Sequence, residues 1–437
     1  MAVIPAESSS SLVTNRLLKI AGTTIFYPLS RLFNLILSTG KYPAAWKTAD
    51  VVPVPKKGGS TFRPISLLPP LSKLFEKVLS DHINSFLDRN KLLSDTQYGF
   101  RRRRSTEMQL LQMSHQWSQA LLERQEVDAI FLDCTKAFDR LPHSVIVESL
   151  AKHGVNGPLR FLLSDYLQER RQRVVIDGFF SEEIAVTSGV PQGSILGPLF
   201  FTIAVNHLSS KVKSPVFQYA DDIVLYRIIR KNDNCAALQQ DVNGITEWCI
   251  ETGLEVNPSK LQHLRISNKR TSNAKVDGGN YNLSSVIIPS VTEAECLGAT
   301  FSSKLDWTAQ VDKVTAKCRR RLCAIKGFFP RRFGSVKQLL FNSLVRSVMD
   351  HASSCWHSTS KTLQRQLETI QKKFLQSIRL GSLLNDGHDR DFKQYRSHLS
   401  EVDWEPVWEL RCKGILLNAF KIWAGVFTGG DSILKKE

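Results

Sequence analysis

The sequence has no uninterrupted apolar run long enough to cross a membrane. Its longest such run, residues 195–205, has 11 residues and contains Gly197 and Pro198, whereas a spanning helix needs about 20. Residues 1–11 have neither a basic start nor an apolar core, so no secretory signal is expected. These absences predict an intracellular protein, cytoplasmic or nuclear, without a membrane partner.

Paired cysteines are also lacking. The eight cysteines are scattered and form no Cys-x-x-Cys pair, and no histidine pair follows at a zinc-binding distance. We therefore expect reduced thiols rather than a disulfide framework or a zinc knuckle. No internal repeat or low-complexity tract is present.

Positive charge is what the sequence has in excess. There are 58 Lys and Arg against 41 Asp and Glu, which gives a net charge of +17. A balance of this kind is typical of proteins that bind a polyanion. The basic residues stand in short blocks, which are Arg101–Arg104, Arg170–Arg171 with Arg173, Arg319–Arg321 and Arg331–Arg332. Each block alone is also consistent with an ordinary solvated surface.

The hydrophobic pattern predicts an α+β fold. Helical periodicity occurs over residues 12–37, 71–93, 107–124 and 195–208, and from residue 308 onward the pattern is almost wholly helical. Short strands are predicted at residues 49–54, 129–133, 173–177, 183–187, 216–219 and 223–227. Residues 268–282 are polar and typical of a loop.

Three aspartates stand where apolar strands end. Asp133 closes the run 129–132, and Asp221 and Asp222 lie between two apolar strands. Carboxylates beside a core are costly unless they are paired or bind a metal, and a hard divalent cation relieves repulsion among them. By itself the Asp-Asp pair also fits a plain hairpin turn.

The surrounding strings resemble the motifs of non-LTR (LINE-type, jockey-like) reverse transcriptases. Residues 131–139 (FLDCTKAFD) resemble the first palm motif, residues 188–198 (SGVPQGSILGP) the second, residues 219–222 (YADD) the third and residues 254–260 (LEVNPSK) the fourth. Residues 63–68 and 97–101 resemble fingers motifs, and residues 296–298, followed by residues 305–307, resemble the primer-grip hairpin that leads into the thumb.

The resemblance implies an RNA-directed DNA polymerase with a right-hand fold of fingers, palm and helical thumb. Its palm would be an antiparallel sheet packed on helices. The implied ranges are an N-terminal helical extension (1–47), fingers (48–127), palm (128–294), primer grip and thumb (295–350) and a C-terminal helical region (351–437). The implied partners are an RNA template, a DNA primer and deoxynucleoside triphosphates, with the element's own RNA in a ribonucleoprotein as a further partner.

The resemblance also implies site residues. Two Mg²⁺ ions, for which Mn²⁺ can substitute, would be held by Asp133, Asp221, Asp222 and the Cys134 backbone carbonyl. Residues implied to contact the nucleotide are Arg63, Lys57 (or Lys56), Phe138 as a steric gate, Gln192, Gly193 and Lys260. Residues implied to contact template or primer are Arg101, Arg102, Tyr219, Leu297 and Gly298.

Ordinary structural alternatives remain for several of these residues. Phe138 also fits a core position, and Arg63 or Lys260 also fits an exposed surface. At the level of the whole chain, the alternatives are an inactive nucleic-acid-binding relic and a reverse transcriptase of the group II intron maturase type.

Overall fold

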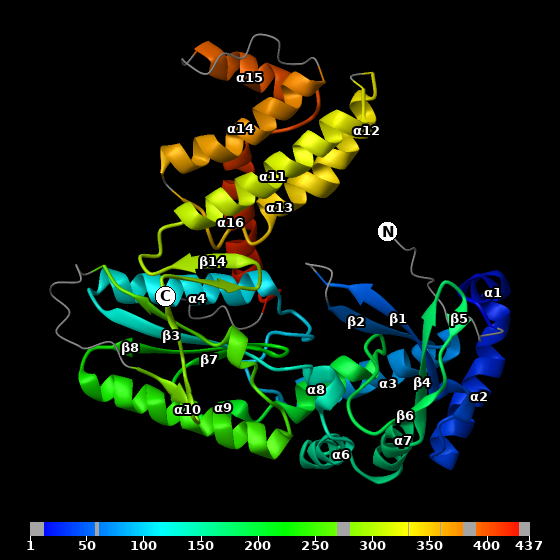
Figure 1. Cartoon of the computed structure of the whole chain (residues 1–437). Helices are drawn as coiled ribbons and strands as arrows, with labels where there is room; N and C mark the ends of the chain where they lie inside the picture. The colour runs from blue at the N-terminus through cyan, green and yellow to red at the C-terminus, as the bar shows by residue number, and fades with distance from the viewer. Residues whose placement is uncertain are drawn as a thin grey trace.

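The computed structural model describes residues 13–56, 61–268, 280–330, 332–358, 360–378 and 390–427. Helices and strands alternate through its first three hundred residues, and helices alone follow (Figure 1). The α+β class predicted from the sequence is confirmed.

One five-stranded sheet is built from the early part of the chain. Its strands are β1 (Thr48–Pro55), β2 (Phe62–Leu67), β4 (Arg170–Ile176), β5 (Phe179–Phe180) and β6 (Ile184–Val186). The order is β2-β1-β4-β5, with β6 also on β4; β1 and β4 are parallel, and the other pairs are antiparallel. The strands predicted at residues 173–177 and 183–187 both exist, but β6 pairs with residues 170–172 of β4, and residues 175–176 pair with β5 instead. The sequence pattern does not predict β2.

The second five-stranded sheet carries the aspartates. Its strands are β3 (Glu126–Asp133), β7 (Val216–Tyr219), β8 (Asp222–Ile229), β9 (Gln262–Ile266) and β12 (Ser290–Val291). The order is β12-β9-β3-β8-β7, antiparallel except for β12 with β9. β3 therefore lies at the centre of the sheet.

Both faces of β3 are covered, because its side chains alternate between two apolar clusters. Ile130 and Leu132 belong to the cluster that includes α10 (Asn232–Thr252). Ala129 and Phe131 belong to the cluster that includes α4 (Thr106–Leu122). Figure 1 shows α4 and α10 on opposite sides of this sheet.

Further helices connect and cover the two sheets. They are α3 (Pro70–Arg89), α5 (Ala137–Arg140), α6 (His143–Lys152), α7 (Gly157–Leu167), α8 (Leu196–Ala204) and α9 (Leu208–Lys211). One apolar cluster runs from Phe75 of α3 through α8 to Leu132 of β3. Because this core is continuous, packing marks no boundary between the predicted fingers and palm ranges, which stay predictions.

The chain after residue 292 forms a hairpin and then only helices. The hairpin consists of β13 (Glu293–Cys296) and β14 (Ala299–Ser302); two more short strands, β10 (Asn282–Leu283) and β11 (Val286–Ile287), pair just before it. The helices are α11 (Thr308–Phe328), α12 (Gly334–Leu340), α13 (Ser347–Asp350), α14 (Lys361–Ser377), α15 (Arg390–Ser400) and α16 (Val407–Trp423). They rise above the second sheet in Figure 1.

The N-terminal helical stretch differs from the prediction. The periodicity of residues 12–37 predicts one helix, but the stretch is divided at Gly22 into α1 (Asn15–Ala21), a short 3-10 turn and α2 (Phe26–Thr39). By length and composition alone, Asn15–Thr39 could cross a membrane, a test that core helices of soluble proteins also pass. The sequence-based expectation considered only unbroken apolar runs, so the absence of a membrane partner stays a prediction.

Candidate active site

Strand register brings the aspartates together. Asp133, the last residue of β3, is paired with Asp222, the first residue of β8. Opposed residues of antiparallel strands have Cα atoms roughly 4.5–5.5 Å apart. Tyr219 at the end of β7 is paired with the same Asp222, and Ala220 turns the chain with a φ of 58°. Asp221 therefore stands in the turn, directly before the Asp133–Asp222 pair.

Burial and neighbouring carboxylates disfavour the charged forms of Asp221 and Asp222. Burial, followed by the charges of Asp221 and Asp133, raises the pKa of Asp222 to about 7. Burial and Asp133 also raise the pKa of Asp221, while Lys260 and Arg63 act in the opposite direction. A carboxylate cluster in this condition is stabilised by added positive charge.

Lys260 supplies one positive charge to the cluster. Its Nζ forms an ion pair with Asp133 Oδ2, and this contact is the main cause that raises the pKa of Lys260. The side chain of Lys260 is 59% exposed, so it can leave Asp133 without breaking a core contact. The resemblance implied a nucleotide contact for Lys260, and the structure places it beside the carboxylates.

The donor chemistry of the cluster fits a hard divalent cation. Oxygen ligands from carboxylates and backbone carbonyls are those that Mg²⁺ and Mn²⁺ prefer. As the described side chains stand, no group of three His, Cys, Asp or Glu residues is arranged around one point as metal ligands would be. Asp133 is instead turned toward Lys260, and a rotation of its carboxylate would redirect it to its neighbours.

The Cys134 carbonyl is directed toward the same cluster. Cys134 forms a bridge with Val256 in which Thr135 N donates to Glu255 O (2.7 Å) and Asn257 N donates to Asp133 O (2.8 Å). In a pair of this kind the central residue's own N–H and C=O point away from its partner. They therefore point toward the edge of β3 that β8 occupies, and the buried Cys134 thiol takes no part.

The loop of residues 188–194 lies between two other parts of the site. The Gln192 Nε2 donates to Asp139 Oδ1 (2.8 Å), and the Gln192 carbonyl accepts from Ser66 N on β2 (2.7 Å). A Cβ on Gly189 would lie 2.5 Å from the carbonyl oxygens of Phe138 and Asp139, and one on Gly193 would lie 2.6 Å from Ser66 O. Both positions therefore require glycine, because the protein's own backbone approaches too closely to leave room for a Cβ.

Phe138 stands beside this loop with its ring half-buried. The ring is stacked on Phe201 of α8, with centroids 4.5 Å apart, and lies at 83° to the ring of Phe100, with centroids 5.8 Å apart. It therefore has both a core contact and an open side, and its role as a gate stays a prediction.

The basic residues predicted to hold a triphosphate differ in where they lie relative to the carboxylates. Arg63 is exposed on β2, and its charge is among those that lower the pKa of Asp221. It is therefore close enough to the carboxylates to act with them. Lys56 is exposed, and Lys57 lies outside the described residues.

Among the basic blocks, not every arginine can reach a phosphate. Arg170 is only 2% exposed and donates to Tyr166 O (3.1 Å), so the prediction that its block binds a polyanion is wrong for this residue. Arg101 donates to Ser94 O (2.6 Å) and is largely buried, whereas Arg102 is exposed beside Asp81. Arg331 lies outside the described residues.

The hairpin implied as the primer grip is a two-residue turn beside the site. Leu297 and Gly298 both have positive φ, 48° and 82°, as expected for the tight turn that joins β13 to β14. The Asp222 charge contributes to the raised pKa of the buried Cys296. The hairpin is therefore near the carboxylates.

Two buried residues that position the site had no predicted role. Gln97 Oε1 accepts from Ala220 N (3.1 Å), directly before Asp221, and a Cβ on Gly99 would lie 2.4 Å from the same nitrogen. Glu76 Oε2 accepts from Ile195 N (2.7 Å) and Leu196 N (3.2 Å) where α8 begins. The available signal for Glu76 was a charged residue on the apolar face of a predicted helix.

Comparisons with known proteins agree with this geometry. Residues 54–301 match the family of reverse transcriptases (RNA-dependent DNA polymerases). The chain is similar to a probable RNA-directed DNA polymerase from transposon BS of Drosophila melanogaster, 26% identical over 86% of this chain and 43% of that protein. It is also similar to the RNA-directed DNA polymerase from the mobile element jockey of that species, 24% identical over 84% of this chain and 41% of that protein.

Solved structures of telomerase give a weaker likeness. Apo telomerase from Candida tropicalis has a TM-score of 0.46 and 13% identity, over 94% of this chain and 73% of that one. The chain spans less than half the length of the transposon relatives above. Those relatives confirm the predicted resemblance to non-LTR, jockey-like polymerases. Since the family match covers more than half of the sequence, the chain belongs to the reverse transcriptase (RNA-dependent DNA polymerase) family.

Proposed function

We propose that this chain is an RNA-directed DNA polymerase of a non-LTR retrotransposon, which extends a DNA primer on an RNA template. The observation that carries the proposal is the register of Asp133 with Asp222, beside Asp221 in the turn. Reverse transcriptases depend on divalent metal, and we propose two Mg²⁺ ions, replaceable by Mn²⁺, between these carboxylates. Bound there, they would activate the primer 3′-hydroxyl and offset the charge of the leaving pyrophosphate.

The residues of the chain would divide the remaining work. Asp133 and Asp221 would hold both ions, with Asp222 and the Cys134 carbonyl completing the oxygen set. Arg63, exposed near Asp221, would pair with the triphosphate. Lys260 would move from Asp133 to the nucleotide as metal binds, since the carboxylate cannot serve both cations at once.

The loop and hairpin would place the two reactants. Gln192 and Gly193 would contact the incoming deoxynucleotide, and the Phe138 ring would exclude a ribose 2′-hydroxyl. Tyr219, Leu297 and Gly298 would hold the primer end. We propose RNA template, DNA primer and deoxynucleoside triphosphates as partners, and a cytoplasmic or nuclear location, because the site and the charge of +17 both suit nucleic acid.

Primer extension tests the proposal. The purified chain should extend oligo(dT) on poly(rA) with dTTP and Mg²⁺. Asp221→Asn should lower kcat by at least about 100-fold, because a metal ligand supplies several kcal/mol in the transition state. Primer–template binding should be nearly unchanged, since the substitution removes a charge that the fold disfavours.

Asp233→Asn is the matched control, because Asp233 is an exposed aspartate on α10. It should extend like the wild type. A wild-type chain that binds primer–template but never extends it would identify an inactive relic, and normal extension by Asp221→Asn would refute the metal assignment.

A further inference from the structure

Residues 351–356, which we call the connecting turn, join three parts of the molecule. The turn follows α13 and is buried beyond its first residue: His351 is exposed, and Ala352, Ser353, Ser354 and Cys355 are buried. Toward α4, Ser354 Oγ bonds Glu107, and Ser114 Oγ donates to the Cys355 carbonyl (3.4 Å). The turn is therefore anchored to α4, the helix that covers one face of the second sheet.

His351 links the connecting turn to the β13–β14 hairpin. Its Nε2 donates to the Leu297 carbonyl at 3.0 Å. A Cβ on Gly298 would approach the same ring nitrogen to 3.2 Å, closer than ordinary contact. The imidazole thus lies directly against the two residues implied to hold the primer.

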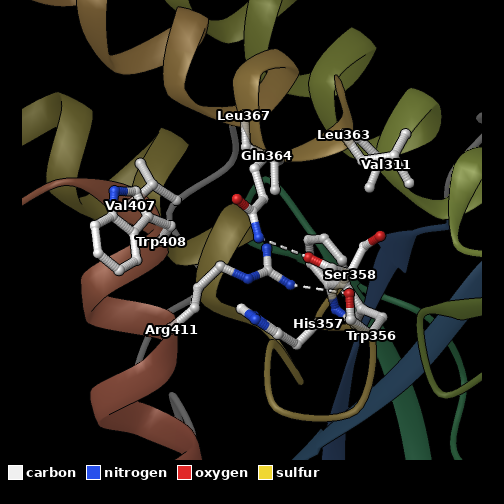
Figure 2. Close-up of a pocket in the computed structure, with 10 residues that line it drawn as sticks. All are labelled: Val311, Trp356, His357, Ser358, Leu363, Gln364, Leu367, Val407, Trp408 and Arg411. Carbon is white, nitrogen blue, oxygen red and sulfur yellow. Dashed lines mark hydrogen bonds between the residues drawn. The ribbon is translucent and has the colours of Figure 1, made fainter. Parts of the chain in front are cut away.

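Arg411 links the connecting turn to α16. Its guanidinium donates to the carbonyls of Ser353 and Trp356, each at 3.2 Å, and lies 3.7 Å above the Trp356 ring. Figure 2 shows Arg411 reaching from α16 to Trp356 and His357. The Trp356 indole N–H donates in turn to the His351 carbonyl at 2.9 Å. These bonds form a continuous chain from α16 to the hairpin.

The contact between Arg411 and the connecting turn is buried. Arg411 is 4% exposed, and burial lowers its pKa to about 10. Within the described residues no carboxylate lies within ion-pair distance of its guanidinium. The charge of Asp350 partly opposes this lowering of the pKa, and carbonyl oxygens and an aromatic face contact the guanidinium directly. A second bond from α16, Asn418 Nδ2 to Ser354 Oγ (3.0 Å), fixes the same turn.

We propose that α16 is a positioning element for the polymerase site. Through Arg411, the connecting turn and His351, it fixes the position of Leu297 and Gly298. That position would in turn determine where the primer end lies relative to Asp133 and Asp221. The inference rests on the proposed function, because it assumes that the hairpin contacts the primer. It gives the C-terminal helical region a role in extension.

Steady-state extension on poly(rA)–oligo(dT) tests the inference at His351, whose exposed side chain can be removed without opening the core. His351→Ala should raise the KM for primer–template or lower kcat by about 5- to 10-fold, the equivalent of one hydrogen bond. The KM for dTTP should change less than 2-fold. His351→Gln should recover most of the loss, because its amide N–H can donate to Leu297 O.

A histidine of the same region provides the control. His398 on α15 contacts Glu401, and His398→Ala should extend like the wild type. Arg411→Met should reproduce the His351→Ala defect, and the double variant should be no worse than Arg411→Met alone. If Arg411→Met fails to fold, Arg411→Lys, which keeps the charge but not the paired carbonyl bonds, replaces it in the cycle.

The outcomes separate the two hypotheses. If the wild type does not extend, the proposed function fails. If the wild type extends and His351→Ala has the same constants, only the inference fails. An additive double variant, or a defect confined to the KM for dTTP, would also overturn the connection through the turn.

Discussion

At the residue scale, the Phe138 ring is the proposed gate for the sugar of an incoming nucleotide. The ring is held flat on Phe201, with 14° between the two planes, and is braced by Phe100, whose ring lies at 83° to it. It cannot swing into the core, because Phe201 is itself fully buried. A ring fixed on one side and half-open on the other is suited to exclude an added hydroxyl by contact.

Phe138→Ala should therefore admit ribonucleotides. The ratio of kcat/KM for dTTP over UTP should fall by at least about 10-fold, since relief of a steric penalty of about 1.4 kcal/mol changes a rate ratio tenfold. Single-nucleotide incorporation on poly(rA) measures both values. Phe100→Ala removes the brace and leaves the gate ring, so its ratio should move much less. An unchanged ratio in Phe138→Ala would mean that the ring is only a core contact.

At the scale of elements, the loop of residues 188–194, which we propose contacts the nucleotide, depends on its neighbours for its shape. It is held from β2 by Ser66, from residues 138–139 by Asp139 and from α3 by the buried Glu76. Burial raises the pKa of Glu76, and the two amides at the start of α8 oppose that rise. These contacts hold the loop in place without a bound nucleotide, and a binding site held in advance has a smaller ordering cost.

Gly193→Ala should distort this loop. The residue has a φ of +126° and its new Cβ would lie 2.6 Å from the Ser66 carbonyl, so backbone strain of about 1–3 kcal/mol is expected. The KM for dTTP should rise by about 10-fold or more, while primer–template affinity stays within 2-fold. Gly327→Ala is the control, because nothing lies within 4 Å of that position on α11. It should stabilise the helix by about 0.5–1 kcal/mol. Equal dTTP constants for both variants would contradict the role of the loop.

Local patterns predicted the parts of the site that local sequence determines. The apolar runs that end at Asp133 and surround Asp221 indicated both strands, and the glycines of residues 188–198 indicated a loop. The contacts of Glu76 with Ile195, of Gln97 with Ala220 and of His351 with Leu297 join positions 119, 123 and 54 residues apart. Such pairings depend on the packed fold and leave no periodic signal in the chain, so they could not be predicted.

Some predicted helix and strand boundaries were wrong for a related reason. The helix predicted at residues 71–93 ends at Arg89, because Asn90 no longer has a helical backbone. β2 was missed because Pro64 interrupts its pattern, yet it pairs with β1 along six residues. Pairing with β1 makes this segment a strand despite its weak intrinsic strand propensity.

At the scale of the whole molecule, exposed positive charge lies in the loop before α4 and along α11. Arg102 and Arg103 follow α3 and precede α4, and Arg319 and Arg320 are exposed on α11 above the second sheet. The buried Arg170 shows that the net charge of +17 overstates what a ligand meets. Exposed arginines before α4 and on α11 favour a duplex held by its phosphates.

Affinity for an RNA–DNA primer–template should therefore fall steeply with salt. If six phosphates are bound, the association constant should drop about 10³-fold between 50 and 200 mM salt, because each neutralised phosphate releases condensed counterions. Fluorescence anisotropy of a labelled duplex gives the slope of log K against log salt. Arg319→Gln with Arg320→Gln should make that slope shallower by about two, one for each phosphate that is no longer neutralised, and should weaken all sequences equally. A slope near zero in the wild type would show that the basic surface does not hold nucleic acid, whatever the aspartates do.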